Sequence, residues 1–405
     1  MRFGFLTECD TRPGSTHYHR YFELVDEVLL AEKVGFDFVG ASEQHFAIGG
    51  ATVSAPEVLY PYLIALTNRI RFIHAITLLP TNFNHPLRVA ERVATEDILS
   101  NGRIDLGTGR GNTTLALRAF QVAPDENKAQ WDEGIELIRR AFLDDPFMFE
   151  GEIYQVPPRS LVPKPVQLPH PPLWVAATSP DTHQQAAEKG IGAISFSSYL
   201  GFEYSKNALQ VYDETFAATE HPFPVNYAKG MLVGGAMHCA ETTEQAREEA
   251  APMPEYAKLS LGGYERLAKL SADYAYMGAV KDVAFDDPEY MLNESAGFIV
   301  GDPEDCIKQG RVYEELGIDL LLMRIDSLPH EKLMRSIELF GKYVIPHFKA
   351  SKTIVRPAED VIGEIRELRP VHEAALERLA AEKAQQEPVA VGTASDGETS
   401  GGGAS

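Results

Sequence analysis

Short apolar runs alternate with longer amphipathic stretches along most of the chain. The run RFGFLTE at 2–8 predicts a strand, and the pattern at 18–35 predicts an amphipathic helix that ends at Gly35. The next apolar run, FDFVGAS at 36–42, predicts a second strand. Together these segments form a strand–helix–strand unit, which is typical of a parallel sheet.

The same alternation continues toward residue 347. Further strands are predicted at 69–79, 103–109, 173–177, 192–197, 230–240 and 319–325, and helices at 55–67, 86–100, 127–143, 181–190, 203–218, 303–316 and 330–347. Eight strands that are each followed by a helix predict an α/β fold, a (β/α)8 TIM barrel over residues 1–348. A doubly wound sheet is the alternative.

Two stretches interrupt this alternation. Residues 146–172 have hairpin and proline-rich character, and residues 252–300 form a long, irregular stretch that contains Gly262 and Gly263. We therefore expect insertions after strands four and seven of the barrel. The second insertion is long enough to act as a mobile lid over an active site.

The chain changes character after residue 348. Residues 349–387 can form a helical extension that is broken near Pro370, and residues 388–405 are rich in glycine and serine. Such a composition predicts a disordered tail, for which we expect no catalytic role.

Charge and composition exclude several classes of function. The net charge is −22 and there is no basic block, which argues against nucleic-acid binding. No apolar stretch approaches the roughly 18 residues of a membrane span, and the N-terminus lacks a signal-peptide pattern. The three cysteines are far apart, as expected for reduced thiols. A cytoplasmic enzyme without membrane contact is therefore expected.

The active site of a barrel lies at the C-terminal ends of its strands. Polar residues follow most of the predicted strands at that end. They are Thr7-Glu8-Cys9, Glu43-Gln44-His45, Thr81-Asn82, Arg110 with Asn112, Thr178-Ser179, Ser197-Ser198, His238, and Arg324 with Asp326.

Two of these groups can form an anion site. The loop GTGRGN at 107–112 exposes backbone donors around Arg110, whose planar guanidinium suits a phosphate group. Thr178, Ser179 and Thr182 lie at the start of a predicted helix, where N–H groups bind anions. Helix capping alone is the alternative for Ser179 and Thr182. Both groups together predict a phosphate-binding site.

Other chemistries lack their motifs. The loop at 107–112 has no third glycine and no acidic ribose-binding residue, so it is not a dinucleotide fingerprint. No HExxH or cysteine-pair spacing predicts a metal site. No GxSxG motif predicts the nucleophile of a hydrolase.

Three strings resemble the bacterial luciferase-like flavin monooxygenase family: GFDFVGASEQHF, HAITLLPTNFNHPLRVAERVATEDILSNGRIDLGTGRG and PHEKLMRSIELFGKYVIPHF. This resemblance covers about residues 1–348. It implies a two-component monooxygenase that uses reduced FMN and molecular oxygen to oxygenate a small organic substrate. The reduced FMN would come from a separate flavin reductase, and we expect a homodimer.

The resemblance also implies roles for residues. Arg110 would contact the flavin phosphate together with Ser179 and Thr182, with Thr178 beside them. A non-prolyl cis peptide bond beneath the flavin ring would fall at Ala75-Ile76.

The stretch SEQHF at 42–46 departs from the light-emitting members, which have a catalytic histidine where this chain has Gln44. Light emission from aldehydes is therefore not expected. Glutamine can orient a substrate by hydrogen bonds, but it cannot carry protons near neutral pH as an imidazole can. The neighbouring His45 can carry them, or it can fill a polar core position beside Glu43. Gln44 and His45 are the candidate catalytic residues.

Two alternatives use the same fold. Some members of the wider superfamily bind a deazaflavin and transfer hydride without oxygen, and others bind flavin without turnover. The dense set of polar residues at the strand ends favours an enzyme.

Overall fold

The computed structural model describes residues 1–349 except 48–49, 294 and 327. The predicted C-terminal extension and tail lie outside the described residues, apart from Lys349.

Eight parallel strands close into a barrel in the order β1-β12-β9-β8-β7-β4-β3-β2. The barrel strands are β1 (Arg2–Thr7), β2 (Phe38–Ala41), β3 (Arg71–Leu78), β4 (Ile104–Gly109), β7 (Leu173–Ala177), β8 (Gly192–Ser195), β9 (Lys229–Val233) and β12 (Leu320–Arg324). Strands β2, β4 and β12 are buried along their whole length. A parallel strand covered on both faces often appears in a sequence as a continuous apolar run, which explains why the apolar runs located β2 and β12.

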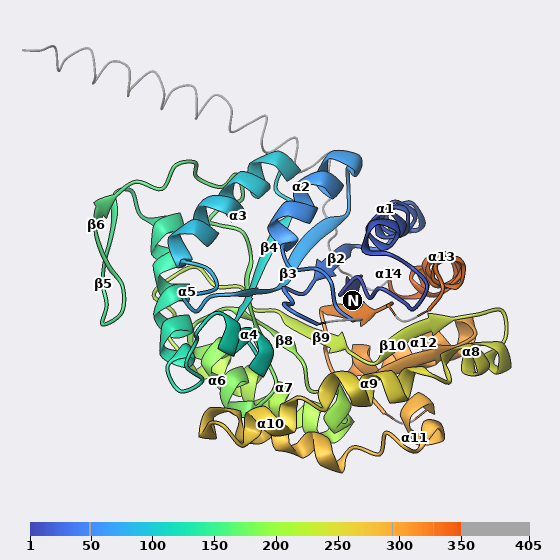
Figure 1. Ribbon diagram of the computed structural model, residues 1–405. Helices are drawn as coiled ribbons and strands as arrows, with labels where there is room; N and C mark the ends of the chain where they lie inside the picture. The colour runs from blue at the N-terminus through green and yellow to red at the C-terminus, as the bar shows by residue number, and fades with distance from the viewer. Residues whose placement is uncertain (48–49, 294, 327, 350–405) are drawn as a thin grey trace, which may run out of the picture. The chain divides into compact units, whose positions relative to one another are not determined.

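Helices surround the strands on the outside of the barrel (Figure 1). They are α1 (His17–Val34), α2 (Pro56–Leu66), α3 (Pro86–Ser100), α4 (Thr114–Ala119), α5 (Asn127–Leu143), α6 (Pro180–Glu188), α7 (Phe202–Ala218), α12 (Pro303–Glu315) and α13 (His330–Leu339). The short helix η1 (Ser198–Leu200) precedes α7, and a π-helical turn, η3 (Phe340–Val344), joins α13 to α14 (Pro346–Lys349). Thr16 caps α1, and Gly35 ends it with φ 105°. The predicted (β/α)8 barrel is confirmed.

The interior of the barrel is filled by side chains. This inner cluster consists of Leu6, Phe38, Ile73, Ala75, Trp174, Ile194, Ala228, Leu320 and Leu322. A larger apolar cluster packs the strands against the helices. The barrel is thus a packed core, and its ligand site must lie at one end.

The prediction of one seventh strand over 230–240 is wrong. After β9, strand β10 (Ala236–Cys239) leaves the barrel and pairs in parallel with β11 (Phe298–Gly301). The break falls at Gly234 and Gly235, where a Cβ on Gly235 would lie 2.4 Å from the Gly297 carbonyl oxygen. As a result, His238 does not lie at the end of a barrel strand. Its side chain is buried, and its Nε2 lies 2.7 Å from a carboxylate oxygen of Glu249.

Both predicted insertions are present. The first contains an antiparallel hairpin of β5 (Phe147–Glu150) and β6 (Gln155–Arg159), which stands away from the barrel strands in Figure 1. The second was expected to be irregular but is mostly helical. It follows α8 (Thr243–Ala250) and contains α9 (Met253–Leu261), α10 (Tyr264–Ala268), η2 (Ala272–Asp282) and α11 (Pro288–Asn293). These helices span 5 to 11 residues, which is too short for clear helical periodicity. None of the described helices combines the length and apolar character that a membrane crossing needs.

Candidate active site

A cavity of about 420 Å³ lies where the barrel strands end. We call it the mouth cavity. The predicted cofactor-binding and catalytic residues line this cavity, with the exception of His45. They are Gln44, Ala75, Ile76, Arg110, Thr178, Ser179 and Thr182. Its volume is within the range of small-molecule sites, about 300 to 1,000 Å³. The fold therefore brings strand ends that are far apart in the sequence to one concave site.

One end of the mouth cavity is built to hold an anion. Arg110 follows β4, and its side chain is 18% exposed. Ser179 caps α6, and its Oγ accepts a hydrogen bond from the Thr182 N–H at 3.3 Å. The first N–H groups of a helix carry partial positive charge, so Arg110 and the start of α6 attract the same anionic group.

His183 holds Ser179 in place through a hydrogen bond to its carbonyl oxygen. Sequence reasoning did not select His183. Its Nδ1 lies 2.9 Å from the Ser179 carbonyl oxygen and its Nε2 2.7 Å from Ser195 Oγ. Burial lowers the pKa of His183 to about 4, so the ring is neutral. Because a carbonyl only accepts, Nδ1 carries the proton and Nε2 accepts from Ser195. The spacing of four residues on one helix is the signal that could have found it.

Arg110 already has an anionic partner in this structure. Its Nη1 lies 3.3 Å from Asp273 Oδ2, and its Nη2 donates to the Asp273 carbonyl oxygen at 2.6 Å. The guanidinium also stacks on the ring of Tyr274 at 4.2 Å. Both partners come from η2 in the second insertion, which sequence reasoning could not place beside Arg110. The Asp273 carboxylate shows that this position accepts a negative group.

The floor of the mouth cavity is apolar. The Ala75–Ile76 peptide bond in β3 is cis, as the resemblance implies, and the register with β4 shifts between His74 and Thr77. A Cβ on Gly109 would lie only 1.9 Å from Ile76 Cδ1, so the Ile76 side chain occupies the space that a larger residue at 109 would need. The rest of the floor comes from Val175, Ile194, Leu232 and Leu322. Such a surface suits the face of a planar aromatic ring.

Gln44 lies on the opposite wall. Its side-chain Nε2 donates to Glu8 Oε1 at 3.2 Å, and its backbone N–H donates to the Val53 carbonyl at 2.9 Å. The Glu8 carboxylate lies 3.0 Å from Arg324 Nη2. The amide of Gln44 is therefore held in a defined orientation at the cavity wall.

His45 lies behind this wall in an aromatic cluster. Its ring stacks on Phe83 at 6.0 Å and meets Phe120 edge-on at 4.8 Å, and the side chain is 12% exposed. Its Nε2 lies 3.1 Å from Glu43 Oε1, while Glu43 Oε2 accepts the Leu78 N–H at 2.8 Å. Glu43 does line the mouth cavity. His45 thus contacts the site through Glu43.

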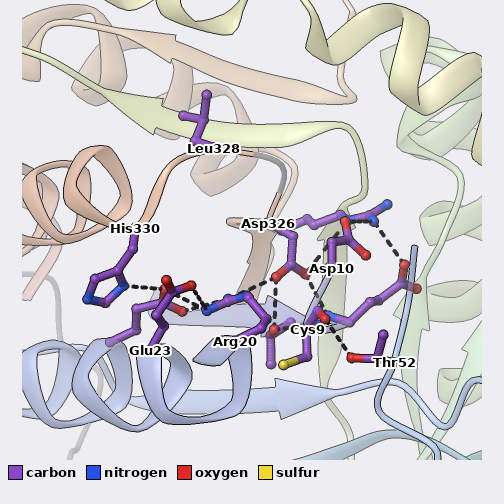
Figure 2. Close-up of polar contacts among 12 residues, drawn as sticks. Cys9, Asp10, Arg20, Glu23, Thr52, Asp326, Leu328 and His330 are labelled. Atoms are coloured by element: carbon purple, nitrogen blue, oxygen red, sulfur yellow. Dashed lines mark hydrogen bonds and ion pairs between the residues drawn. The ribbon is translucent and has the colours of Figure 1, made fainter. Parts of the chain in front are cut away.

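A buried network of charges supports the wall that carries Glu8 (Figure 2). Asp326 Oδ2 accepts the Glu8 N–H at 2.6 Å, and Asp326 Oδ1 lies 3.3 Å from Arg20 Nη2. Arg324 pairs with Asp10 at 2.6 Å. Burial raises the pKa of Asp10 to about 6, although Arg324 acts in the opposite direction. Buried charges of this kind are costly unless paired, so the network fixes the positions of its members.

Cys9, the cysteine at the predicted end of the first strand, is buried. Burial raises the pKa of its thiol to about 12, and Cys239 and Cys306 are also buried. Because thiolates are the reactive form, we expect Ellman's reagent to modify none of the three cysteines in the folded protein. In denaturant, all three should react. Rapid modification of Cys9 in the native protein would contradict this assignment.

Comparisons with known proteins identify the family. A sequence profile of the luciferase-like monooxygenases matches residues 1–320. The chain belongs to this family. It is 24% identical over 88% of its length to the oxygenase component of a flavin-dependent trigonelline monooxygenase from Acinetobacter baylyi, of which 98% is covered. It is 26% identical over 81% of its length to an F420-dependent glucose-6-phosphate dehydrogenase from Amycolatopsis mediterranei, of which 95% is covered. These names agree with an enzyme of the flavin-dependent oxidoreductase and monooxygenase class.

Solved structures share the fold of this luciferase-like chain. The monooxygenase RslO1 from Streptomyces bottropensis superposes with a TM-score of 0.69 at 25% identity, covering 86% of this chain and all of the other. The oxygenating constituent of 3,6-diketocamphane monooxygenase from Pseudomonas putida, solved in complex with FMN, gives a TM-score of 0.67 at 21% identity, with 85% and 98% covered.

Proposed function

We propose that this luciferase-like protein is the oxygenase component of a two-component monooxygenase that uses reduced FMN and molecular oxygen to oxygenate a small organic substrate. The arrangement of the mouth cavity carries this proposal. An anion-binding end at Arg110 and α6 adjoins an apolar floor at Ala75-Ile76, within one cavity of about 420 Å³.

The residues present fit FMN. Arg110 holds a carboxylate now, and a phosphate group would offer its guanidinium the same charge. Ser179 and Thr182 would add donors at the start of α6, with Thr178 beside them. The apolar floor would pack against the isoalloxazine ring.

The protein's own residues then hold and orient the reactants. Reduced FMN supplies the electrons with which oxygen is activated. Gln44, whose amide is fixed by Glu8, orients the substrate at the cavity wall. Residues of η2, including Asp273 and Tyr274, line the cavity and exclude water from it.

A separate reductase fits this proposal, because the relative from Acinetobacter baylyi is named as the oxygenase component of its monooxygenase. The loop at 107–112 is also not a dinucleotide fingerprint. We expect the protein with FMN and NADH alone to oxidise no substrate, and added flavin reductase to start turnover.

Anaerobic titration tests the cofactor. The protein is mixed with reduced FMN, reduced riboflavin or a reduced deazaflavin, and binding is followed by absorbance and fluorescence. We expect reduced FMN to bind most tightly, followed by oxygen consumption when air is admitted. Tight binding of the deazaflavin with hydride transfer and no oxygen uptake would instead support the dehydrogenase alternative. Because free reduced FMN also reacts with oxygen, the reaction is compared with that of FMN alone. A rate and a hydrogen peroxide yield equal to those of free reduced FMN would support a flavin-binding protein.

We also propose a homodimer formed through α2. Val58, Tyr62 and Leu66 are spaced four residues apart on this helix, and their exposed fractions are 70%, 51% and 42%. An aligned apolar face of this kind is typical of a protein interface. We expect Val58→Asp to convert the dimer to a monomer in analytical ultracentrifugation, while Val162→Asp, an equally exposed position in the first insertion, leaves it dimeric. A wild-type monomer would contradict the proposal.

A further inference from the structure

A second cavity of about 190 Å³ borders the mouth cavity. Glu8, Gln44 and Arg324 line both cavities and form a shared wall between them. The Glu8 side chain is 17% exposed, so a ligand in either cavity can approach it. The charge of this wall therefore acts on whatever ligand lies beside it.

At this wall, one guanidinium is shared by three carboxylates. Arg324 Nη2 lies 2.6 Å from Asp10 and 3.0 Å from Glu8, and Arg324 Nε lies 3.9 Å from Asp326. The pKa of Asp10 is raised to about 6, most strongly by burial and also by the charges of Asp326 and Glu8, although Arg324 lowers it. At pH 8, Asp10 is therefore ionised, and Arg324 cannot neutralise all its neighbours.

The rest of the buried network does not supply the missing positive charge (Figure 2). Arg20 lies 3.3 Å from Asp326, but it also pairs with both oxygens of Glu27 at 2.9 and 2.8 Å. His330 lies 3.0 Å from Glu27 at the outer end of the network. Even with His330 protonated, acidic groups outnumber basic ones among the described members, which are Glu8, Asp10, Glu23, Glu27 and Asp326 against Arg12, Arg20, Arg324 and His330.

Glu8 carries this excess of negative charge to the cavities. Its Oε1 accepts a hydrogen bond from Gln44 Nε2 at 3.2 Å, and its Oε2 contacts Arg324. A carboxylate has about four acceptor positions, so these two contacts leave room for a further positive partner. Buried charges without a matching partner are costly, and a cation beside Glu8 would remove part of this cost.

Aromatic rings surround the same wall. Phe196 and Tyr264 line both cavities, and Tyr256 and Phe285 line the second. The face of an aromatic ring carries negative charge and attracts cations, above all alkylated ammonium groups. The Tyr256 ring already has the Arg324 guanidinium 5.1 Å from its centre. Rings and carboxylates thus favour a ligand of the same sign.

We infer that the substrate is a compact organic cation, whose positive group lies at the wall shared by the two cavities, beside the Glu8 carboxylate and the surrounding rings. Glu8 is then a specificity-determining residue. The size allows a single ring with small substituents, because a cavity of about 150 Å³ holds benzene and the second cavity is moderately larger. This inference rests on the proposed function, since it takes the ligand of this wall to be the substrate.

Three probes of nearly equal shape and different charge test the sign without any turnover. They are N,N,N-trimethylanilinium, neutral tert-butylbenzene and anionic benzenesulfonate. Binding to the full chain is measured by equilibrium dialysis at pH 8 and low salt, with saturating oxidised FMN, so that the sulfonate does not occupy the anion-binding end at Arg110. We expect the cation to bind about tenfold or more tightly than the sulfonate, because like charges repel strongly in a cavity.

Glu8→Gln and a matched control assign the effect to this wall. Glu8→Gln keeps an acceptor for Gln44 but removes the charge, and it should weaken binding of the cation roughly three- to thirtyfold while leaving tert-butylbenzene unchanged. Glu255→Gln removes the same charge from an exposed position on α9 that lines neither cavity, and it should change the binding of no probe.

The outcomes separate this inference from the proposed function. Equal or tighter binding of the sulfonate in the wild type overturns the inference, whether or not the variants fold. The same holds if Glu8→Gln weakens the cation and tert-butylbenzene equally, because the carboxylate then acts on shape and not on charge. Failure of FMN to bind overturns the proposed function alone, and inorganic phosphate then replaces FMN at Arg110 while the three probes are compared.

Discussion

Replacing Arg110 with alanine is expected to lower the affinity for reduced FMN by about 10- to 150-fold, because a hydrogen bond from a charged group contributes roughly 1.5 to 3 kcal/mol. Arg110 supplies the only guanidinium at the anion-binding end of the mouth cavity among its described lining residues. Anaerobic titration measures the change. Riboflavin, which lacks the phosphate, should bind the wild type and Arg110→Ala equally.

Asp273→Asn is a matched variant for which we expect the opposite effect on the affinity for reduced FMN. The Asp273 carboxylate lies 3.3 Å from the guanidinium and competes with any other anion there. Removing its charge should raise the affinity for reduced FMN only a fewfold, because a partly exposed ion pair contributes about 0 to 1 kcal/mol. Equal affinities of wild type and Arg110→Ala for FMN would remove Arg110 from the phosphate site. Unchanged affinity in Asp273→Asn would show that the Asp273 carboxylate does not compete with the phosphate group.

The fold could be predicted from the sequence because each barrel strand is buried on both faces. Continuous apolar runs such as LLLM at 320–323 mark such strands without any long-range information. The prediction of the seventh strand was wrong because its outcome depends on long-range pairing. The run at 230–240 is apolar apart from His238, but its second half pairs with residues 298–301, about sixty positions later in the chain. Local patterns do not contain that partner.

Part of the site could also be predicted, because local patterns locate the ends of the barrel strands. The rule that ligands bind where barrel strands end selected Arg110, Ser179 and Gln44, and all three line the mouth cavity. Asp273 could not be selected, because it comes from η2 and reaches the mouth cavity only through tertiary packing. The sequence also does not show in which direction a side chain points. His45 follows Gln44 directly, yet it lies behind the wall that Gln44 forms.

From that position we propose for His45 a positioning role in place of the proton carrier that its sequence neighbourhood suggests. Its Nε2 lies 3.1 Å from Glu43, and Glu43 in turn accepts the Leu78 N–H at the end of β3. We therefore treat His45 as a positioning residue that acts on the cavity through Glu43. Loss of this contact should let the wall relax, so that activated oxygen is released as hydrogen peroxide before it reaches the substrate.

Two substitutions separate this role from packing. His45→Phe keeps an aromatic ring against Phe83 and Phe120 but loses the contact with Glu43, whereas His45→Ala loses both. We expect both variants to bind reduced FMN and to release more hydrogen peroxide per FMN oxidised in the presence of substrate. Only His45→Ala should lose stability, by about 0.5 to 3 kcal/mol, as ring contacts disappear. Gln44→Ala should instead weaken substrate binding with a smaller effect on peroxide release. If His45→Phe couples oxygen consumption to product as well as the wild type does, His45 serves packing only, and Gln44 remains the residue of this stretch that acts on the reaction.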